Sequence, residues 1–168
     1  MLRAIEPEDS AMLLRLINDP DTEQMLGGSS FPVSAASQAK WMEQQRTRDD
    51  VLRCVIVLPD KQDEGLGTVI LSDIDQKNGT AQIHLKLDAS ARNKGYGTDA
   101  VCALTNYAFR QLRLQCIYAD ILSYNEVSQR LFTKCGFQRE GVLRSRVYKG
   151  GKYCDIISYS CLEQDLVR

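Results

Sequence analysis

The sequence contains a single histidine, His84, and no cysteine pair with the C-x-x-C spacing typical of zinc and thioredoxin-like sites. This scarcity argues against a histidine-rich metal site, excludes any mechanism that needs two histidines, and leads us to expect no bound metal. No apolar run approaches the roughly 20 residues that a membrane helix requires. The N-terminus is acidic and shows no signal-peptide pattern. We therefore expect a cytoplasmic protein with no membrane partner.

An excess of charge of either sign is also lacking. The 21 Lys and Arg residues nearly balance 22 Asp and Glu residues, so that we expect no nucleic-acid partner. The 168 residues are 43% hydrophobic and 26% charged, which is typical of a globular chain. No repeat or linker interrupts them, and we predict one domain over residues 1–168. The six cysteines lie mostly among apolar residues, and we expect them to be buried, reduced thiols.

The spacing of the apolar residues predicts strands and helices in a mixed order. Strands are expected at residues 2–5, 51–58, 65–73, 80–87, 116–122, 137–148 and 152–162. Helices are expected at residues 8–18, at about 34–48, from the glycine-containing segment at 92–98 to about residue 112, and at 125–135. Residues 21–33 are expected to be rich in loop. Antiparallel meanders thus flank one strand–helix–strand crossover, which has to be parallel and right-handed.

The segment Arg92–Thr98, of sequence RNKGYGT, lies between a predicted strand and the longest predicted helix. The first amides of that helix have no partners within it, and its dipole is positive at this end. Two glycines allow the backbone to approach an anion, and Arg92 and Lys94 add positive charge. These features predict a phosphate or pyrophosphate site, although an ordinary glycine-containing turn has the same pattern.

Two known phosphate loops can be compared with this segment. The P-loop motif is absent. The pattern Gly95-x-Gly97-x-x-Ala100 fits a relaxed dinucleotide-binding fingerprint. However, the preceding strand ends about seven residues before Gly95, whereas that fingerprint follows its strand directly. A dinucleotide-binding domain is therefore the less favoured alternative.

The same segment resembles the GNAT superfamily of acetyl-CoA-dependent N-acetyltransferases, whose [QR]-x-x-G-x-[GA] signature is met by Arg92-x-x-Gly95-x-Gly97. Asn125-Glu-Val-Ser128 and Lys134-Cys-Gly-Phe137 are similar to the family's N-x-x-[SA] and K-x-G-F elements. Glu140-Gly141 and Gly151-Lys-Tyr-x-Asp155 resemble a branch that contains RimJ/RimL-type protein, SpeG-type polyamine and amino-sugar acetyltransferases. The resemblance spans essentially the whole chain.

The resemblance implies an α/β (α+β) GNAT fold, with a mixed, mostly antiparallel twisted sheet of about seven strands, splayed around the CoA site and flanked by about four helices. Acetyl-CoA is then the co-substrate. Its pantetheine arm would bond the strand before the glycine loop and Asn125, and its pyrophosphate would bond the loop amides. The implied cofactor-binding residues are Leu85, Lys86, Leu87, Arg92, Asn93, Lys94, Gly95, Tyr96, Gly97, Thr98, Asn125, Ser128, Phe132 and Lys134.

Simpler structural roles stand beside some of these assignments. Asn125 is well suited to cap the N-terminus of the predicted helix at 125–135. Ser128 has the pattern of a solvent-facing helical serine. Gly136 is typical of a helix C-cap in the left-handed conformation.

Acetyl transfer to an amine requires removal of a proton, because an alkyl amine with a pKa near 10.4 is almost fully protonated at neutral pH. The chain departs from the family at two positions that serve such steps. Phe132 stands where many relatives have a tyrosine that protonates the leaving thiolate, and Gln82 stands where many have a glutamate. Ser128, and less surely Tyr124, are the remaining hydroxyl candidates for the leaving group.

His84 is the first candidate base, because its unperturbed pKa lies near 6.5. By strand alternation it shares a face with Gln82 and Lys86, and that face is either the substrate cleft or a structural surface. Asp73 is the alternative, as a base or as a carboxylate that binds the ammonium group. It lies where SpeG-type proteins bind polyamine, but a second acidic position there is Ile70, which disfavours a spermidine acceptor.

The sequence thus predicts an N-acetyltransferase that moves an acetyl group from acetyl-CoA to a primary amine, on a small molecule or a protein N-terminus, by direct transfer in a ternary complex. A non-catalytic CoA-binding regulatory module is the alternative from another class. A homodimer is left open, since relatives often dimerise.

Overall fold

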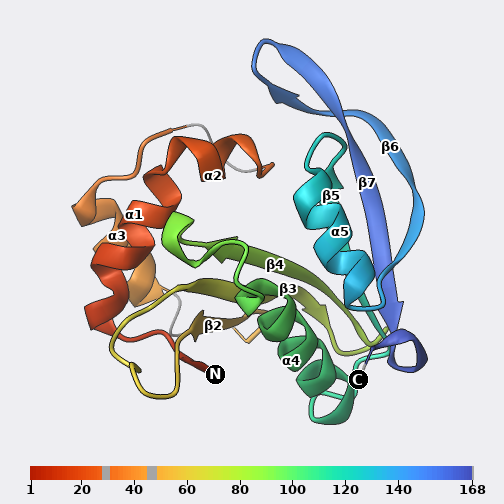
Figure 1. Cartoon of the computed structure of the whole chain (residues 1–168), viewed down its shortest axis with the longest axis horizontal. Coiled ribbons are helices and arrows are strands. Elements are labelled where there is room, and N and C mark those ends of the chain that lie inside the picture. The colour runs from red at the N-terminus through yellow and green to blue at the C-terminus, as the bar shows by residue number, and fades with distance from the viewer. Residues whose placement is uncertain (28–30, 45–48, 168) are drawn as a thin grey trace.

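The computed structural model describes residues 1–27, 31–44 and 49–167, and contains a seven-stranded sheet in the order β1-β2-β3-β4-β5-β7-β6 (Figure 1). Only the neighbours β4 and β5 in this sheet are parallel. The strands are β1 Leu2–Ala4, β2 Leu52–Ile56, β3 Gly67–Asp75, β4 Thr80–Leu87, β5 Cys116–Leu122, β6 Gln138–Lys149 and β7 Lys152–Leu162. The predicted mixed, mostly antiparallel sheet is confirmed, and a doubly wound dinucleotide-binding fold is excluded.

Helices lie on both faces of the sheet. Their bounds are α1 Ser10–Asn18, α2 Pro20–Gln24, α3 Ala35–Gln44, α4 Tyr96–Arg110 and α5 Glu126–Lys134. In Figure 1, α1 and α3 lie at the left of the strands, whereas α4 lies at the lower middle and α5 at the right. Among the described helices, none is long and apolar enough to cross a membrane.

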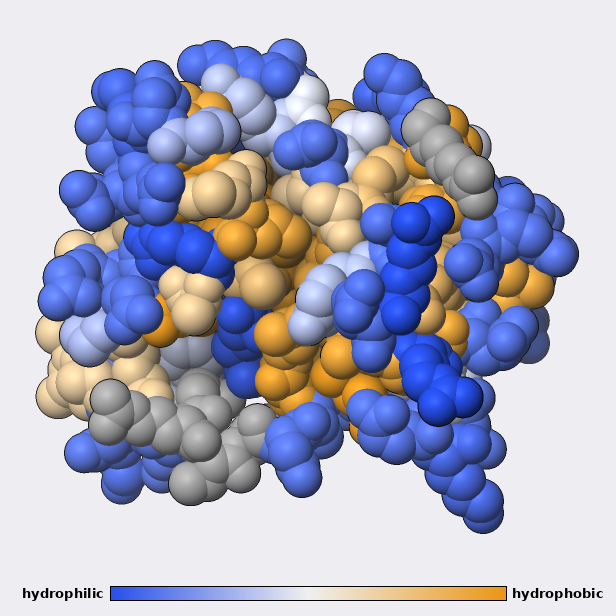
Figure 2. All heavy atoms as spheres, turned by 90° about the horizontal axis from the view of Figure 1, so that it is seen from below, coloured by the Kyte–Doolittle hydropathy of each residue, from blue (hydrophilic) through white to orange (hydrophobic). Residues whose placement is uncertain are grey.

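The main core lies between the sheet and the helices α4 and α5. Alternate residues of the central strands, such as Leu71, Ile83 and Ile117, point to this side and are almost fully buried. They pack against the apolar stripe of α4, which includes Val101 and Leu104. In Figure 2 hydrophobic side chains reach the surface along the middle of the view, between flanks rich in hydrophilic side chains.

A smaller core occupies the opposite face of the sheet. There Met12, Leu13 and Leu16 of α1 pack against Val55 and Val57. Every second residue of β3 and β4 points to this face, and along part of each strand these residues are polar. The face that carries His84 is therefore covered by helices at one end and hydrophilic near the middle of the sheet.

The structure corrects one prediction about the N-terminal half. Residues 21–33 were expected to be rich in loop, but Pro20 begins the short helix α2, which ends at Gln24. Residues 25–27 and 31–33 lie outside helices and strands, as predicted, and residues 28–30 lie outside the described part of the chain. The carboxylate of Asp19 accepts a hydrogen bond from the Thr22 backbone N–H, as a helix N-cap does, and proline is well suited to the first helical position. The predicted helix at 34–48 is α3, and residues 45–48 lie outside the described part of the chain.

The prediction for the cysteines is confirmed in part. All six are free thiols, but only Cys135, Cys154 and Cys161 are buried, and the other three are half-buried. Burial raises the pKa of Cys161 to about 12 and also raises that of Cys135. A thiol held so firmly in its neutral form is a poor nucleophile, which agrees with a packing role for Cys135.

Candidate active site

A gap opens between the parallel strands β4 and β5. The two strands pair only through Thr80–Gln82 and Cys116–Tyr118. Beyond the strand's end, the Asp88 N–H donates to the Leu66 carbonyl, on the β3 side. Because successive residues of a strand turn their backbone groups to opposite neighbours, Leu85 and Leu87 turn theirs toward the gap. The predicted splay is present, and β4 turns the backbone groups of Leu85 to it.

The glycine loop lies at the end of this gap. Gly95 caps α4 in the left-handed conformation with a φ of 86°, and a Cβ at this position would have no atom within 4 Å. Asn93, Lys94 and Gly95 are exposed. The first intrahelical bond is donated by Asp99, so the preceding amides are unused by the helix. These features fit a pyrophosphate group, and Lys94 has no ion pair among the described residues.

The structure uses the side chain of Arg92 differently from the prediction. Its guanidinium donates to the Asp19 carboxylate at 3.0 Å, to the Thr22 hydroxyl at 2.8 Å and to the Leu87 carbonyl at 3.2 Å. The Thr22 hydroxyl and then Arg92 hold the pKa of Asp19 below its usual value. Arg92 thus fastens the start of α2 to the loop, and Lys94 is the cation that remains for a phosphate.

Residues 19–25, here called the α2 bridge, reach across to the other side of the gap as well. Tyr124 donates its hydroxyl to the Gln24 carbonyl, and Asn125 donates its amide to the Met25 carbonyl at 3.0 Å. The buried Lys149 at the β6–β7 turn forms an ion pair with Glu23. Contacts at both ends therefore tie the α2 bridge to β4 and to the segment after β5 (Figure 1).

The cap assignment for Asn125 is confirmed. Its side-chain oxygen accepts from the Ser128 N–H at 3.1 Å while its amide nitrogen bonds Met25. Both polar ends of the Asn125 side chain are therefore held by the protein. Ser128 is half-buried on the first turn of α5, and Lys134 is exposed on the last turn.

Phe132 lies in the main core. It is 3% exposed and stacks edge-on against Phe137, with ring centroids 5.0 Å apart. The structure therefore does not bring this ring to the surface of the gap. Gly97 is also buried, and a Cβ there would meet the leucines of β4 and α5 within about 3 Å. Its absence of a side chain serves the close packing of α4.

Two residues predicted separately, His84 and Asp73, are joined by Ser72. The Ser72 hydroxyl donates to the Asp73 carboxylate at 2.9 Å and lies 2.9 Å from His84 Nε2. A hydroxyl has one proton to donate, so Nε2 carries the hydrogen of this second bond and Nδ1 has a free lone pair. Asp73 is held at a φ of 51° beside a β-bulge, which turns its carboxylate back toward Ser72.

The electrostatic surroundings of His84 extend to β5. His84 is exposed, but the surrounding protein removes part of the water from its ring, and this desolvation lowers the pKa of His84. Lys86 lowers the pKa as well, whereas Asp73 and Asp120 raise it. Burial, Asp73 and Asp120 raise the pKa of Tyr118. His84 is therefore hydrogen-bonded to Ser72, and it shares its electrostatic surroundings, Asp73 and Asp120, with Tyr118. Sequence analysis did not single out Ser72, Tyr118 or Asp120 as site residues. The two on β5 follow only from the strand register, which pairs Gln82 with Tyr118.

Comparison with known proteins agrees with this geometry. Residues 1–138 match the model of the acetyltransferase (GNAT) domain family. The prophage-derived uncharacterized N-acetyltransferase YokL of Bacillus subtilis is 30% identical over 98% of this chain and 90% of its own. The putative ribosomal N-acetyltransferase YdaF of the same organism is 28% identical, over 98% and 91%.

A solved structure shares the fold. The spermidine N-acetyltransferase of Vibrio cholerae, in complex with CoA and spermine, superposes with a TM-score of 0.90 over 98% of this chain and 96% of its own, at 22% identity. A likeness at that identity supports the fold alone, and the family match supplies the activity. The chain belongs to the GNAT acetyltransferase family and is an acetyl-CoA-dependent N-acetyltransferase.

Proposed function

We propose that this enzyme transfers the acetyl group directly to a primary amine, on a small molecule or a protein N-terminus, in a ternary complex in which His84 accepts the proton of the amine. The observation that carries the proposal is the hydrogen-bonded chain from His84 through Ser72 to Asp73. We further propose that residues 1–168 act as one catalytic domain, since all seven strands join one sheet. The 28% identity to a putative ribosomal N-acetyltransferase supports a place in the RimJ/RimL-like branch.

The residues around the gap fit acetyl-CoA. Leu85 would bond the pantetheine arm through its backbone, and the amides from Asn93 to Thr98, with Lys94, would hold the pyrophosphate. When bound, acetyl-CoA supplies an activated acyl carbon with a thiolate leaving group. Ser128, whose hydroxyl has no hydrogen-bond partner among the described residues, is the proposed donor to that thiolate.

The role of His84 follows from its two nitrogens. Nε2 donates to Ser72, which leaves Nδ1 to accept a proton. Since the pKa of His84 is lowered from its ordinary value of 6.5, the ring is neutral at pH 7 and ready to act as a base. The imidazolium that forms would be stabilised by Asp73 through Ser72, and Asp73 would also attract an ammonium group to the site.

The test is His84→Gln, which keeps a polar side chain of similar reach and removes the base. We expect kcat to fall at least tenfold, measured as thiol release from acetyl-CoA in the presence of an amine panel, while the affinity for CoA stays unchanged. In the wild type kcat/KM should rise with pH up to the lowered pKa of His84 and then level off, since only the neutral ring accepts a proton. Near-wild-type activity, or an unchanged acid limb in the variant, would clear His84 of this role.

A further inference from the structure

A pocket of about 420 Å³ opens on the sheet face that carries His84, between the helices α1 and α3 and the strands β3 and β4. Ile70, which lines it, is the register partner of His84, and Lys86 lies two residues further along β4. The size is that of a site for a small molecule. Its walls are mostly apolar and are formed by Ile5, Leu13, Leu16, Ile17, Val33 and Trp41, together with Ile70.

Four polar side chains also line the pocket: Ser37, whose hydroxyl accepts a hydrogen bond from the Ser34 hydroxyl, and three that come from the helix α3 and the strands β3 and β4. Gln38, from α3, is 6% exposed, and Thr68, from β3, is 3% exposed. Lys86 is the register partner of Thr68 on β4. Within the described residues, no hydrogen bond or ion pair engages any of these three side chains. Among the described residues only the Thr105 hydroxyl is both buried and without a partner, so the unpaired polar atoms of these three side chains are open to the pocket. A ligand in the pocket could therefore bond all three.

Lys86 supplies the only charge among the described residues that line this pocket. Burial lowers the pKa of Lys86, and no carboxylate offsets the effect. A carboxylate on the ligand would provide the missing partner, whereas a second ammonium group would be repelled. The pocket therefore discriminates by the charge at the far end of the ligand.

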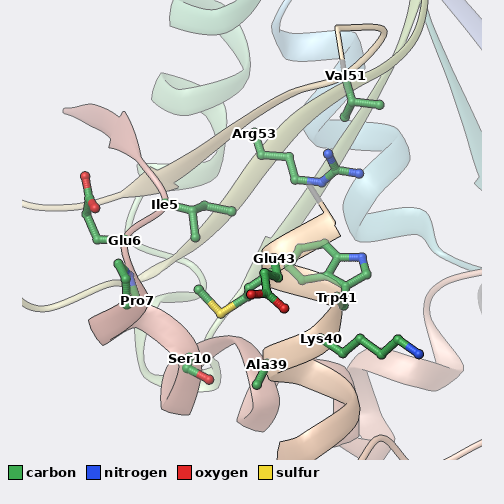
Figure 3. Close-up of a pocket in the computed structure, with 11 residues that line it drawn as sticks. Ile5, Glu6, Pro7, Ser10, Ala39, Lys40, Trp41, Glu43, Val51 and Arg53 are labelled. Carbon is green, nitrogen blue, oxygen red and sulfur yellow. The ribbon is translucent and has the colours of Figure 1, made fainter. Parts of the chain in front are cut away.

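A larger pocket of about 730 Å³ lies beside it, and the two share Ile5 and Trp41 (Figure 3). There the Arg53 guanidinium lies over the Trp41 ring, 5.3 Å from its centroid. Acidic and basic side chains both line this second pocket, Glu6 and Glu43 among them. It therefore offers no single charge that would select a ligand.

On the basis of the proposed function, we infer that the smaller pocket binds the acceptor, and that the acceptor is a small monoamine whose apolar body ends in a carboxylate. Its amine would lie at His84 and its carboxylate at Lys86. Residues two apart in a strand are about 7 Å apart, so the two groups are separated by several bonds. Polyamines are then poor acceptors, in contrast to the spermine-bound Vibrio cholerae enzyme that shares the fold.

Three acceptors of equal chain length test the inference: 6-aminohexanoate, hexylamine and 1,6-diaminohexane. In the wild type we expect kcat/KM, measured by thiol release from acetyl-CoA, to be highest for the carboxylate and lowest for the diamine. Lys86→Glu should reverse that order, with a loss of about tenfold or more for 6-aminohexanoate, and Lys86→Gln should bring the three values together. Lys77→Glu, in the exposed turn before β4, is the matched control and should keep the wild-type order.

The single tryptophan of the chain provides a readout without catalysis, because Trp41 lines the pocket. Saturable binding of 6-aminohexanoate should change the Trp41 fluorescence of the wild type, at about tenfold lower concentration than for Lys86→Glu. If the fluorescence responds but no amine releases thiol, the proposed function fails and the pocket stands. If the wild type acetylates amines but Lys86→Glu leaves both their order and the fluorescence titration unchanged, the inference about the pocket is wrong.

Discussion

At the scale of single residues, Ser72 determines what His84 can do. Without the Ser72 hydroxyl, His84 and Asp73 would be two polar groups on neighbouring strands with no bond between them. With it, one ring nitrogen is fixed as a donor and the other is left as an acceptor. A residue that acts in this way positions the base and does not itself touch the acceptor.

Ser72→Ala should therefore lower kcat by about tenfold, which corresponds to about 1.4 kcal/mol of transition-state stabilisation. The KM for acetyl-CoA should not change, because the glycine loop is untouched. Ser72→Thr keeps the hydroxyl on a residue that suits a strand, and should restore most of the rate together with the wild-type pH profile. An alanine variant with full activity, or a threonine variant as slow as alanine, would show that the chain from His84 to Asp73 is not used.

At the scale of elements, the two glycines at the start of α4 serve different ends. Gly97 lets the helix approach β4 and α5, since a Cβ there would lie 2.9 Å from Leu131 Cδ1 and 3.0 Å from Leu85 Cδ2. Gly95 has open space around it and a positive φ that other residues rarely adopt. The first position serves packing, and the second serves the shape of the anion site.

Gly97→Ala should lower the free energy of unfolding by about 1–3 kcal/mol, as overpacking does, in a urea titration. Gly95→Ala should cost about 1 kcal/mol, through backbone strain alone. Its affinity for CoA should nevertheless fall, because the loop amides are turned away from the anion. Calorimetric titration with CoA would contradict this division of roles if Gly95→Ala bound CoA as tightly as the wild type.

The sequence was sufficient for the elements whose pattern is local. The bounds of β4, β5 and β7 were predicted correctly from alternation and flanking turn residues. The helix α2 was not predicted, although Asp19 followed by Pro20 is typical of a helix start. The partner that holds Asp19, Arg92, lies 73 positions away. Likewise, the bond from His84 to Ser72 depends on strand register and on a bulge, and neither can be obtained from one strand alone.

At the scale of the whole molecule, the sheet consists of two parts that meet at β4 and β5. The α2 bridge provides a further connection between them, through Arg92 on one side and Tyr124, Asn125 and Lys149 on the other. A ligand that bonds both sides of the gap should therefore stabilise the folded chain as a unit.

CoA at about 100 times its dissociation constant should raise the free energy of unfolding by about 2.7 kcal/mol, by mass action. The thermal midpoint should rise with CoA concentration. Arg92→Ala should lower the midpoint without ligand and leave a smaller rise with CoA, since the α2 bridge has lost one end. Differential scanning calorimetry measures both, and a midpoint independent of CoA would contradict the assignment of the gap.

The short pairing of β4 with β5 has a consequence for residues that touch no ligand. Only three residue pairs join β4 to β5, so the packing around these pairs sets the angle between the two strands and the width of the gap. Ala81 and Ile117 lie opposite each other in this pairing and are fully buried. A change of side-chain volume at either position should therefore change the angle between the two parts of the sheet. We therefore expect substitutions at Ala81 or Ile117 to change the affinity for CoA, although both side chains are buried in the core.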